Sequence, residues 1–206
     1  MIHKFLDRIQ IRRIEAYAFA GTSSVRFLVL SNNPTMQIDS AAFSGLRDVQ
    51  MIYLPTGIRR IEADAFNGLQ NVGHLRLPHL DLDELSSFVF RGLRNAQLLT
   101  IQESDLGTIQ RNAFANMTNI SRLSLLNNKI DKIEEIHITA QNRITSLHLI
   151  GNHVLDIPPS ASLKINGVPD CVMKWVNSIS RFKTDSFMLL IELNWVIVKH
   201  VSRSLA

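Results

Sequence analysis

Residues 120–157 read ISRLSLLNNKIDKIEEIHITAQNRITSLHLIGNHVLDI, and this stretch decides the fold because one pattern occurs in it twice. In each copy an isoleucine is followed by leucine three and five residues later and by asparagine eight residues later. Leucines two residues apart, with other side chains between them, are typical of a strand that buries one face. The second copy begins at Ile144, 24 residues after Ile120.

The same pattern continues in phase toward the N-terminus. Four earlier copies begin at Val25, Val49, Val72 and Ala96, so that successive starts lie 24, 23, 24, 24 and 24 residues apart. A period held this closely indicates an internal repeat and not an ordinary globular domain with scattered leucines. It predicts a solenoid in which each repeat adds one strand to a parallel sheet, with strands about 4.8 Å apart.

Two further positions recur. A phenylalanine stands near the end of successive repeats, at Phe19, Phe43, Phe66, Phe90 and Phe114. We expect these rings to stack as a second internal row. Asn33, Asn128 and Asn152 take the turn position, where a buried carboxamide can bond backbone groups of neighbouring loops. Other residues stand there in the remaining repeats, namely Gly57, Leu80 and Ser104, so the turn is predicted to be less regular in the middle.

The composition fits such an array and excludes several classes. The chain has 206 residues, of which 46% are hydrophobic and 19% charged, so it can bury a core and is not a disordered tail. The net charge of +4 is small and dispersed, which does not indicate nucleic-acid binding. A single cysteine excludes an internal disulfide framework and a zinc site made of cysteines.

The repeats resemble those of the leucine-rich repeat family over roughly residues 9–157. The segments AFSGLRDV, AFNGLQNV, VFRGLRNA and AFANMTNI are similar to the 24-residue repeats of its extracellular and receptor members. The resemblance implies an α/β solenoid with a curved parallel sheet on the concave face and an irregular or helical convex side. Residues 1–24 would be a partial repeat, 25–157 about six repeats, and 158–206 a degenerate C-terminal cap with an unassigned tail.

The ends depart from the family pattern. Cys171-x-Met173-x-Trp175 resembles the core of the C-terminal cysteine cap, but the companion cysteines are missing. Charged residues interrupt the N-terminus, so it does not read as a signal peptide. The apolar stretch 187–198 is shorter than the about 20 residues of a membrane-spanning helix, and we expect a buried helix or strand there. Membrane attachment of a longer protein stays open.

The side chains between the leucines should point outward on the concave face. By register these include Leu98, Ser146 and the ten residues predicted to contact a ligand, which are Phe27, Val29, Met51, Tyr53, His74, Arg76, Thr100, Arg122, Ser124 and His148. One end of this set is apolar and aromatic, and the rest is basic and polar. Aromatic, methionine and arginine side chains are enriched in protein interfaces, and the resemblance implies binding on this face. We therefore predict a protein ligand.

No motif for catalysis, a cofactor or a metal occurs in the sequence, so we expect neither an enzyme nor a cofactor. Asn116 and Asn119 each begin an N-x-[ST] sequon and are predicted glycosylation sites, which supports secretion weakly. Three functions fit these observations. The chain could be part of an extracellular or cell-surface binding protein, an intracellular scaffold, or a structural matrix component.

Overall fold

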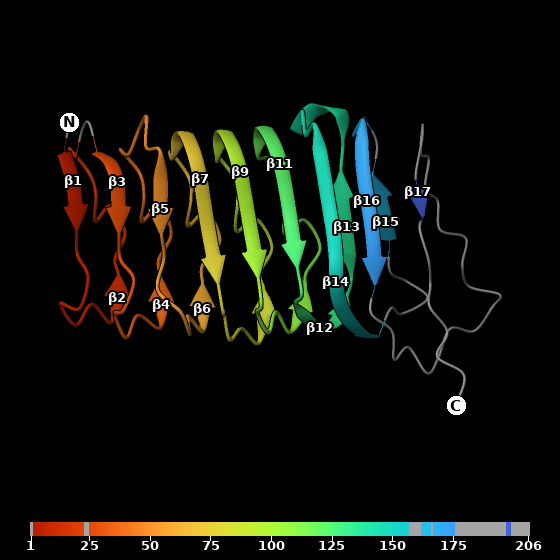
Figure 1. Cartoon of the computed structure of the whole chain (residues 1–206), viewed down its shortest axis with the longest axis horizontal. Coiled ribbons are helices and arrows are strands. Elements are labelled where there is room, and N and C mark those ends of the chain that lie inside the picture. The colour runs from red at the N-terminus through yellow and green to blue at the C-terminus, as the bar shows by residue number, and fades with distance from the viewer. Residues whose placement is uncertain (1, 23–24, 157–161, 166, 176–196, 199–206) are drawn as a thin grey trace.

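The computed structural model describes residues 2–22, 25–156, 162–165, 167–175 and 197–198. The chain winds into a solenoid whose turns lie side by side, with one long parallel sheet along its front (Figure 1). In chain order this wall is formed by β1 (Ile2–Phe5), β3 (Val25–Val29), β5 (Met51–Tyr53), β7 (Gln70–Pro78), β9 (Arg94–Gln102), β11 (Thr118–Leu126), β14 (Ser146–Asp156), β16 (Asp170–Trp175) and β17 (Ile197–Val198). The predicted solenoid is thus confirmed.

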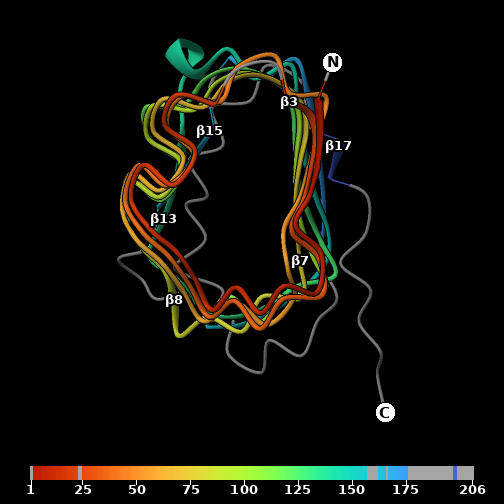
Figure 2. The same cartoon turned by 90° about the vertical axis from the view of Figure 1, so that its left-hand side faces the viewer.

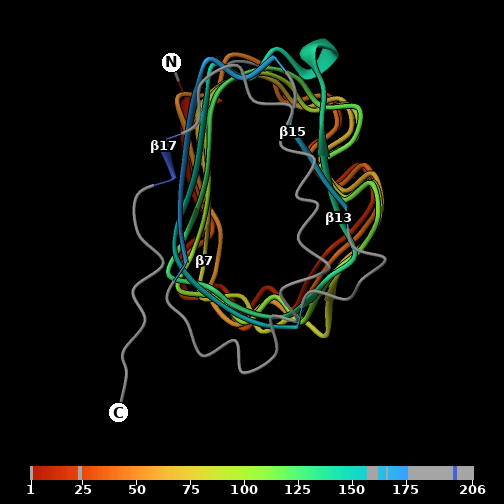
Figure 3. The same ribbon diagram turned by 90° about the vertical axis from the view of Figure 1, so that its right-hand side faces the viewer.

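The return side of each turn is made of short strands and turns. Its strands are β2 (Arg13–Ile14), β4 (Gln37–Ile38), β6 (Arg60–Ile61), β8 (Glu84–Leu85), β10 (Thr108–Ile109), β12 (Lys129–Ile133), β13 (Glu135–Ile138) and β15 (Ser162–Ile165). Within the described ranges, the 3-10 turn η1 (Ala140–Asn142) is the only helical segment. Viewed along the axis, successive turns almost superimpose, with the long sheet on one side and the return strands on the other (Figures 2 and 3).

A left-handed residue in each of the first five return segments explains why this side is not helical there. Tyr17, Ala41, Asp64, Phe88 and Asn112 stand at equivalent positions, and all have φ between 53° and 63°. This conformation interrupts a right-handed helix. It also turns each backbone N–H toward the next repeat: the Ala41 N–H donates to the Asp64 carbonyl at 2.9 Å, and the Asp64 N–H donates to the Phe88 carbonyl at 3.0 Å. The backbone groups that a helix would pair internally therefore link neighbouring turns.

The core between the two walls contains the predicted leucines and the predicted aromatic row. Neighbouring phenylalanine rings from Phe19 to Phe114 lie with centroids 5.3–5.7 Å apart and planes within 13° of parallel. Phe43, Phe66, Phe90 and Phe114 are fully buried. The stack confirms the predicted row of five rings, one from each of five consecutive turns.

The asparagine position forms a buried chain of hydrogen bonds. The Asn152 amide donates to the Leu125 carbonyl at 2.9 Å, while its oxygen accepts from the backbone and side-chain amides of Asn128 at 3.0 and 2.9 Å. The Asn128 oxygen in turn accepts from the Ser104 N–H at 3.1 Å. The Ser104 hydroxyl accepts from the Leu80 N–H at 2.9 Å and donates to the Gln102 carbonyl at 2.8 Å. A serine thus takes over part of the asparagine role in the middle of the array.

Both ends of the described array continue the sheet. In β1, Lys4 occupies the position of Leu28, and its ammonium donates to the Thr22 hydroxyl at 3.4 Å. In β16, Cys171 is the register partner of Leu147 and is buried like the leucines before it. Assignment of residues 158–206 as a degenerate cap stays a prediction. Most of the apolar stretch 187–198 lies outside the described residues.

Candidate functional site

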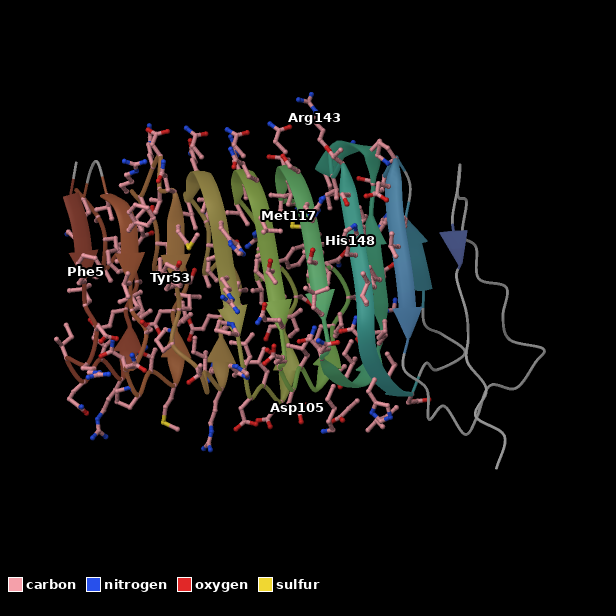
Figure 4. The ribbon with its side chains drawn as sticks, viewed as in Figure 1. Phe5, Tyr53, Asp105, Met117, Arg143 and His148 are labelled. Atoms are coloured by element: carbon pink, nitrogen blue, oxygen red, sulfur yellow. The ribbon has the colours of Figure 1, made fainter. Side chains whose placement is uncertain are left out.

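The parallel register brings the ten predicted ligand-contacting residues into two rows on the outer side of the long sheet, here called the sheet face. The first row runs Phe27, Met51, His74, Leu98, Arg122, Ser146 and Asp170. The second row runs Phe5, Val29, Tyr53, Arg76, Thr100, Ser124, His148 and Val172. Figure 4 shows Phe5, Tyr53 and His148 along this face.

The N-terminal end of the sheet face is apolar. Phe5 is 67% exposed and Tyr53 36% exposed, while Phe27, Val29 and Met51 are partly buried beside them. Phe5 was not among the predicted contact residues, because residues 1–24 were expected to form only a partial repeat. The sequence did contain a pattern that indicates this position, since Phe5 precedes Leu6 as Val29 precedes Leu30.

The middle of the sheet face carries two basic side chains on one strand. The His74 ring nitrogen Nε2 lies 3.1 Å from the Thr100 hydroxyl. Burial, with a smaller effect of the Arg76 charge, lowers the pKa of His74 below its usual value, so the ring is neutral at pH 7. Arg76 is partly buried, and its Nε is covered and makes no hydrogen bond within the described part of the chain. Arg76 therefore supplies the positive charge here.

The C-terminal end combines Ser146, His148 and Asp170. The Ser146 hydroxyl donates to the Asp170 carboxylate at 2.7 Å, and His148 Nε2 lies 3.0 Å from that hydroxyl and 3.5 Å from the carboxylate. The Ser146 hydrogen bond, followed by that of His148, lowers the pKa of Asp170. In a catalytic triad, the aspartate bonds the opposite ring nitrogen from the one that faces serine. Here Nε2 faces both groups, so the cluster does not have the geometry of a nucleophilic relay.

Two of the predicted contact residues are more covered than the others, and so is Ser146, which was not among them. Thr100 is 5% exposed and Ser124 3% exposed, and Ser146 beside them is 5% exposed. Thr100 and Ser124 are register partners of each other, and their row continues with Arg76 on one side and His148 on the other. Direct contact with a ligand is therefore easier for Phe27, Tyr53 and Arg122, which extend further from the sheet. This difference depends on packing and could not be inferred from register alone.

A second polar row runs along one edge of the solenoid, where each turn enters the long sheet; we call it the turn edge. The Asn71 amide donates to Asp48, the Asn95 amide to Asn71, and the Asn119 amide to Asn95, each at 2.8 Å. All four residues are left-handed, with φ of 54–57°, a conformation that asparagine and aspartate tolerate best among residues other than glycine. The signal in the sequence was an Asp or Asn directly before four of the six repeat starts, those at Val49, Val72, Ala96 and Ile120.

This row of hydrogen-bonded side chains, here called the asparagine ladder, distinguishes the two predicted glycosylation sites. A glycan is attached through the same side-chain nitrogen that Asn119 uses to bond Asn95, whereas Asn116 is exposed in the preceding turn and lies outside the ladder. On secretory expression we expect Asn116 to carry the glycan and Asn119 to stay largely unmodified. Mass spectrometry of the secreted chain should show loss of the glycan in Asn116→Gln and its retention in Asn119→Gln. Loss in Asn119→Gln alone would contradict this expectation.

Other reactive groups are few among the residues that the structure describes. Burial, reinforced by the Asp170 charge, raises the pKa of the Cys171 thiol to about 11, so this sulfur is protonated and a poor nucleophile at pH 7. The described residues contain no cluster of three or more histidine, cysteine or acidic side chains that could hold a metal ion. In the described part of the chain, no helix is both long and apolar enough to span a membrane.

Comparison with protein families gives one match. Residues 12–161 match the BspA type Leucine rich repeat region, in six copies. Comparison with curated proteins and with solved structures gives no match. The match covers well over half of the sequence and coincides with the stacked turns of the solenoid, and proteins with such repeats are generally non-enzymatic scaffolds for protein interaction. The chain belongs to the leucine-rich repeat family.

Proposed function

We propose that this chain is a non-enzymatic binding module that recognises a protein ligand on its sheet face. The observation that carries the proposal is the continuity of the face from Phe5 through Tyr53 to Arg76. Phe5, Val29, Tyr53 and Arg76 follow one another on successive strands of the sheet, so two exposed aromatic side chains share a row with a cationic one, and Tyr53 is its direct neighbour. Such a combination resembles the centre of protein interfaces, where aromatic and arginine side chains provide most of the binding energy.

The charge distribution supports a partner with an acidic surface. In the two described rows of the sheet face, Arg76 and Arg122 are cationic, and Asp170 is the one carboxylate. Asp170 is already bonded by Ser146 and His148, so its charge is partly compensated. A ligand that places apolar side chains on Phe27 and Tyr53 and a carboxylate near Arg76 would match this arrangement.

We further propose an extracellular or cell-surface location. The repeat type resembles that of extracellular members of the family, and the exposed Asn116 offers an accessible sequon. Attachment to a membrane through other parts of a longer protein is compatible with this proposal. Retention of the chain, unglycosylated, in the cytosol of its own cells would contradict the proposed location and favour the intracellular scaffold.

The test is a binding screen of the purified chain against secreted and cell-surface proteins, followed by substitution. Tyr53→Ala and Arg76→Ala should each lower the affinity for a genuine ligand by about 30-fold. This corresponds to about 2 kcal/mol of binding free energy, as expected for a hot-spot residue. The matched control is Tyr17→Ala with Arg60→Ala, which removes an exposed aromatic and an exposed arginine from the return side. Equal loss in the control, or unchanged affinity in both sheet-face variants at unaltered melting temperature, would exclude this face.

A further inference from the structure

A separate pocket opens at the turn edge, away from the two rows of the sheet face. Its volume is about 390 Å³, and it is lined by Arg94, Thr118, Asn119, Gln141 and Arg143. Figure 4 shows Arg143 at this edge, above the strands of the long sheet. Neither the proposed ligand face nor the family match assigns a role to this pocket.

The repeat geometry brings these five residues together. Arg94 is the direct register partner of Thr118 across β9 and β11, and Asn119 follows Thr118 in the chain. Arg143 lies one 24-residue period after Asn119, at the end of η1. Its left-handed backbone, with φ of 48°, matches the left-handed Asn119 of the preceding turn. The pocket therefore forms where the asparagine ladder ends and an arginine takes the next position.

The wall that carries Gln141 and Arg143 is held in place by buried hydrogen bonds. The Asn142 side-chain amide donates to the Met117 carbonyl at 2.9 Å, and its oxygen accepts from the Thr139 N–H at 2.9 Å. The Arg143 N–H donates to the Ala140 carbonyl at 3.1 Å, which closes the 3-10 turn. The two flanking residues are thus positioned before any ligand arrives, which reduces the entropy lost on binding.

The lining is rich in donors and contains no carboxylate. Arg94 and Arg143 are exposed and form no ion pair with the described residues. Some other arginines of the array are held in ion pairs, as Arg13 is with Asp39 and Arg91 with Asp64. The Asn119 amide is used in the ladder, but the Thr118 hydroxyl and the Gln141 amide remain as donors beside the two guanidinium groups. Two unpaired cations in one pocket leave a positive potential that an anion would neutralise.

We propose that this pocket binds an oxyanion, in the form of a phosphate or sulfate monoester. Guanidinium groups present planar pairs of N–H donors that match the oxygens of such groups, and the hydroxyl and amide complete the donor set. A phosphorylated side chain and a sulfated sugar share this chemistry. The proposal does not depend on a protein ligand at the sheet face.

The first test titrates the whole chain with inorganic phosphate or sulfate at low ionic strength. Binding is followed by the NMR chemical shifts of the Arg94 and Arg143 side chains. We expect saturable shifts, and at least tenfold weaker binding in Arg94→Gln and in Arg143→Gln. The control is Arg12→Gln, which removes the same charge from an exposed site in the first repeat. Equally weakened binding in the control would show that only the net charge matters and would overturn the proposal. Absence of saturable shifts would overturn it as well.

A second titration distinguishes the two sources of the oxyanion. O-phosphoserine and glucosamine 6-sulfate are compared at equal ionic strength on the whole chain and on Arg94→Gln. Tighter binding of the first would assign a phosphorylated protein segment, and tighter binding of the second would assign a sulfated glycan. Equal affinity for both would assign the oxyanion itself as the recognised group, whereas binding of neither ester would contradict the proposal.

Discussion

Replacing Phe66 with alanine is expected to lower the free energy of unfolding by about 3–5 kcal/mol, the range for fully buried phenylalanines. Phe66 stacks on Phe43 and on Phe90, with ring centroids 5.3 Å away on both sides. Its removal therefore leaves a cavity between two aromatic faces and interrupts the spine in the middle of the array. Whole domains are stable by only about 5–15 kcal/mol, so this loss is large. Urea unfolding followed by circular dichroism measures it.

Two further variants separate stacking from general hydrophobicity. Phe66→Leu keeps most of the buried volume but loses the aromatic contacts, and we expect it to cost about 1–2 kcal/mol. Tyr17→Ala removes an aromatic side chain that is 62% exposed on the return side. It should change stability by no more than about 0.5 kcal/mol, as surface substitutions usually do. Similar losses in Phe66→Ala and Tyr17→Ala would show that the stacked row contributes nothing special to the array.

Replacing Gly107 with alanine is expected to lower the free energy of unfolding by at least about 3 kcal/mol. The loss comes from strain of the left-handed backbone together with overpacking. Gly107 has φ of 51°, and an added Cβ would lie 1.9 Å from the Asp83 carbonyl oxygen of the preceding turn. The contact is with backbone and cannot be relieved by rotating a side chain. Moving Gly107 away would also disturb its carbonyl, which accepts from the Asp131 N–H at 2.8 Å in the following turn.

Gly57 offers the matched control for this substitution. Its φ is 74°, but an added Cβ would meet nothing within 4 Å. Gly57→Ala should therefore show the conformational cost alone, about 1 kcal/mol. Thermal and urea unfolding of the two variants measure the difference between them. Equal stability would mean that the turns can separate enough to accept a methyl group at Gly107.

The sequence predicted those features that depend only on the period. Leucines and phenylalanines recur every 23 or 24 residues, so they had to lie on the same side of each turn and stack. For the same reason the sequence alone placed Tyr53 and Arg76 as neighbours on one face. Asn128 and Asn152 were correctly expected to bond backbone groups in the turn, because their spacing matched that of the strands.

Features that depend on packing between turns were not predictable in this way. One such feature is the burial of Thr100 and Ser124, which both occupy outward positions in the register. The Ser104 hydroxyl replaces an asparagine because it lies near the Leu80 N–H of the preceding turn. Similarly, the Arg13–Asp39 pair joins residues 26 positions apart, slightly more than one period.

By itself, then, the sequence determined that this chain forms a stack of parallel turns and which side chains enter the core or face outward, because period and alternation fix these directions. Only the tertiary structure decided what the outward groups do. It ended the asparagine ladder at Asn119 and placed Arg143 with Arg94 around a pocket. The physical reason is that such contacts depend on backbone conformation and on side-chain reach between turns, neither of which a repeat pattern contains.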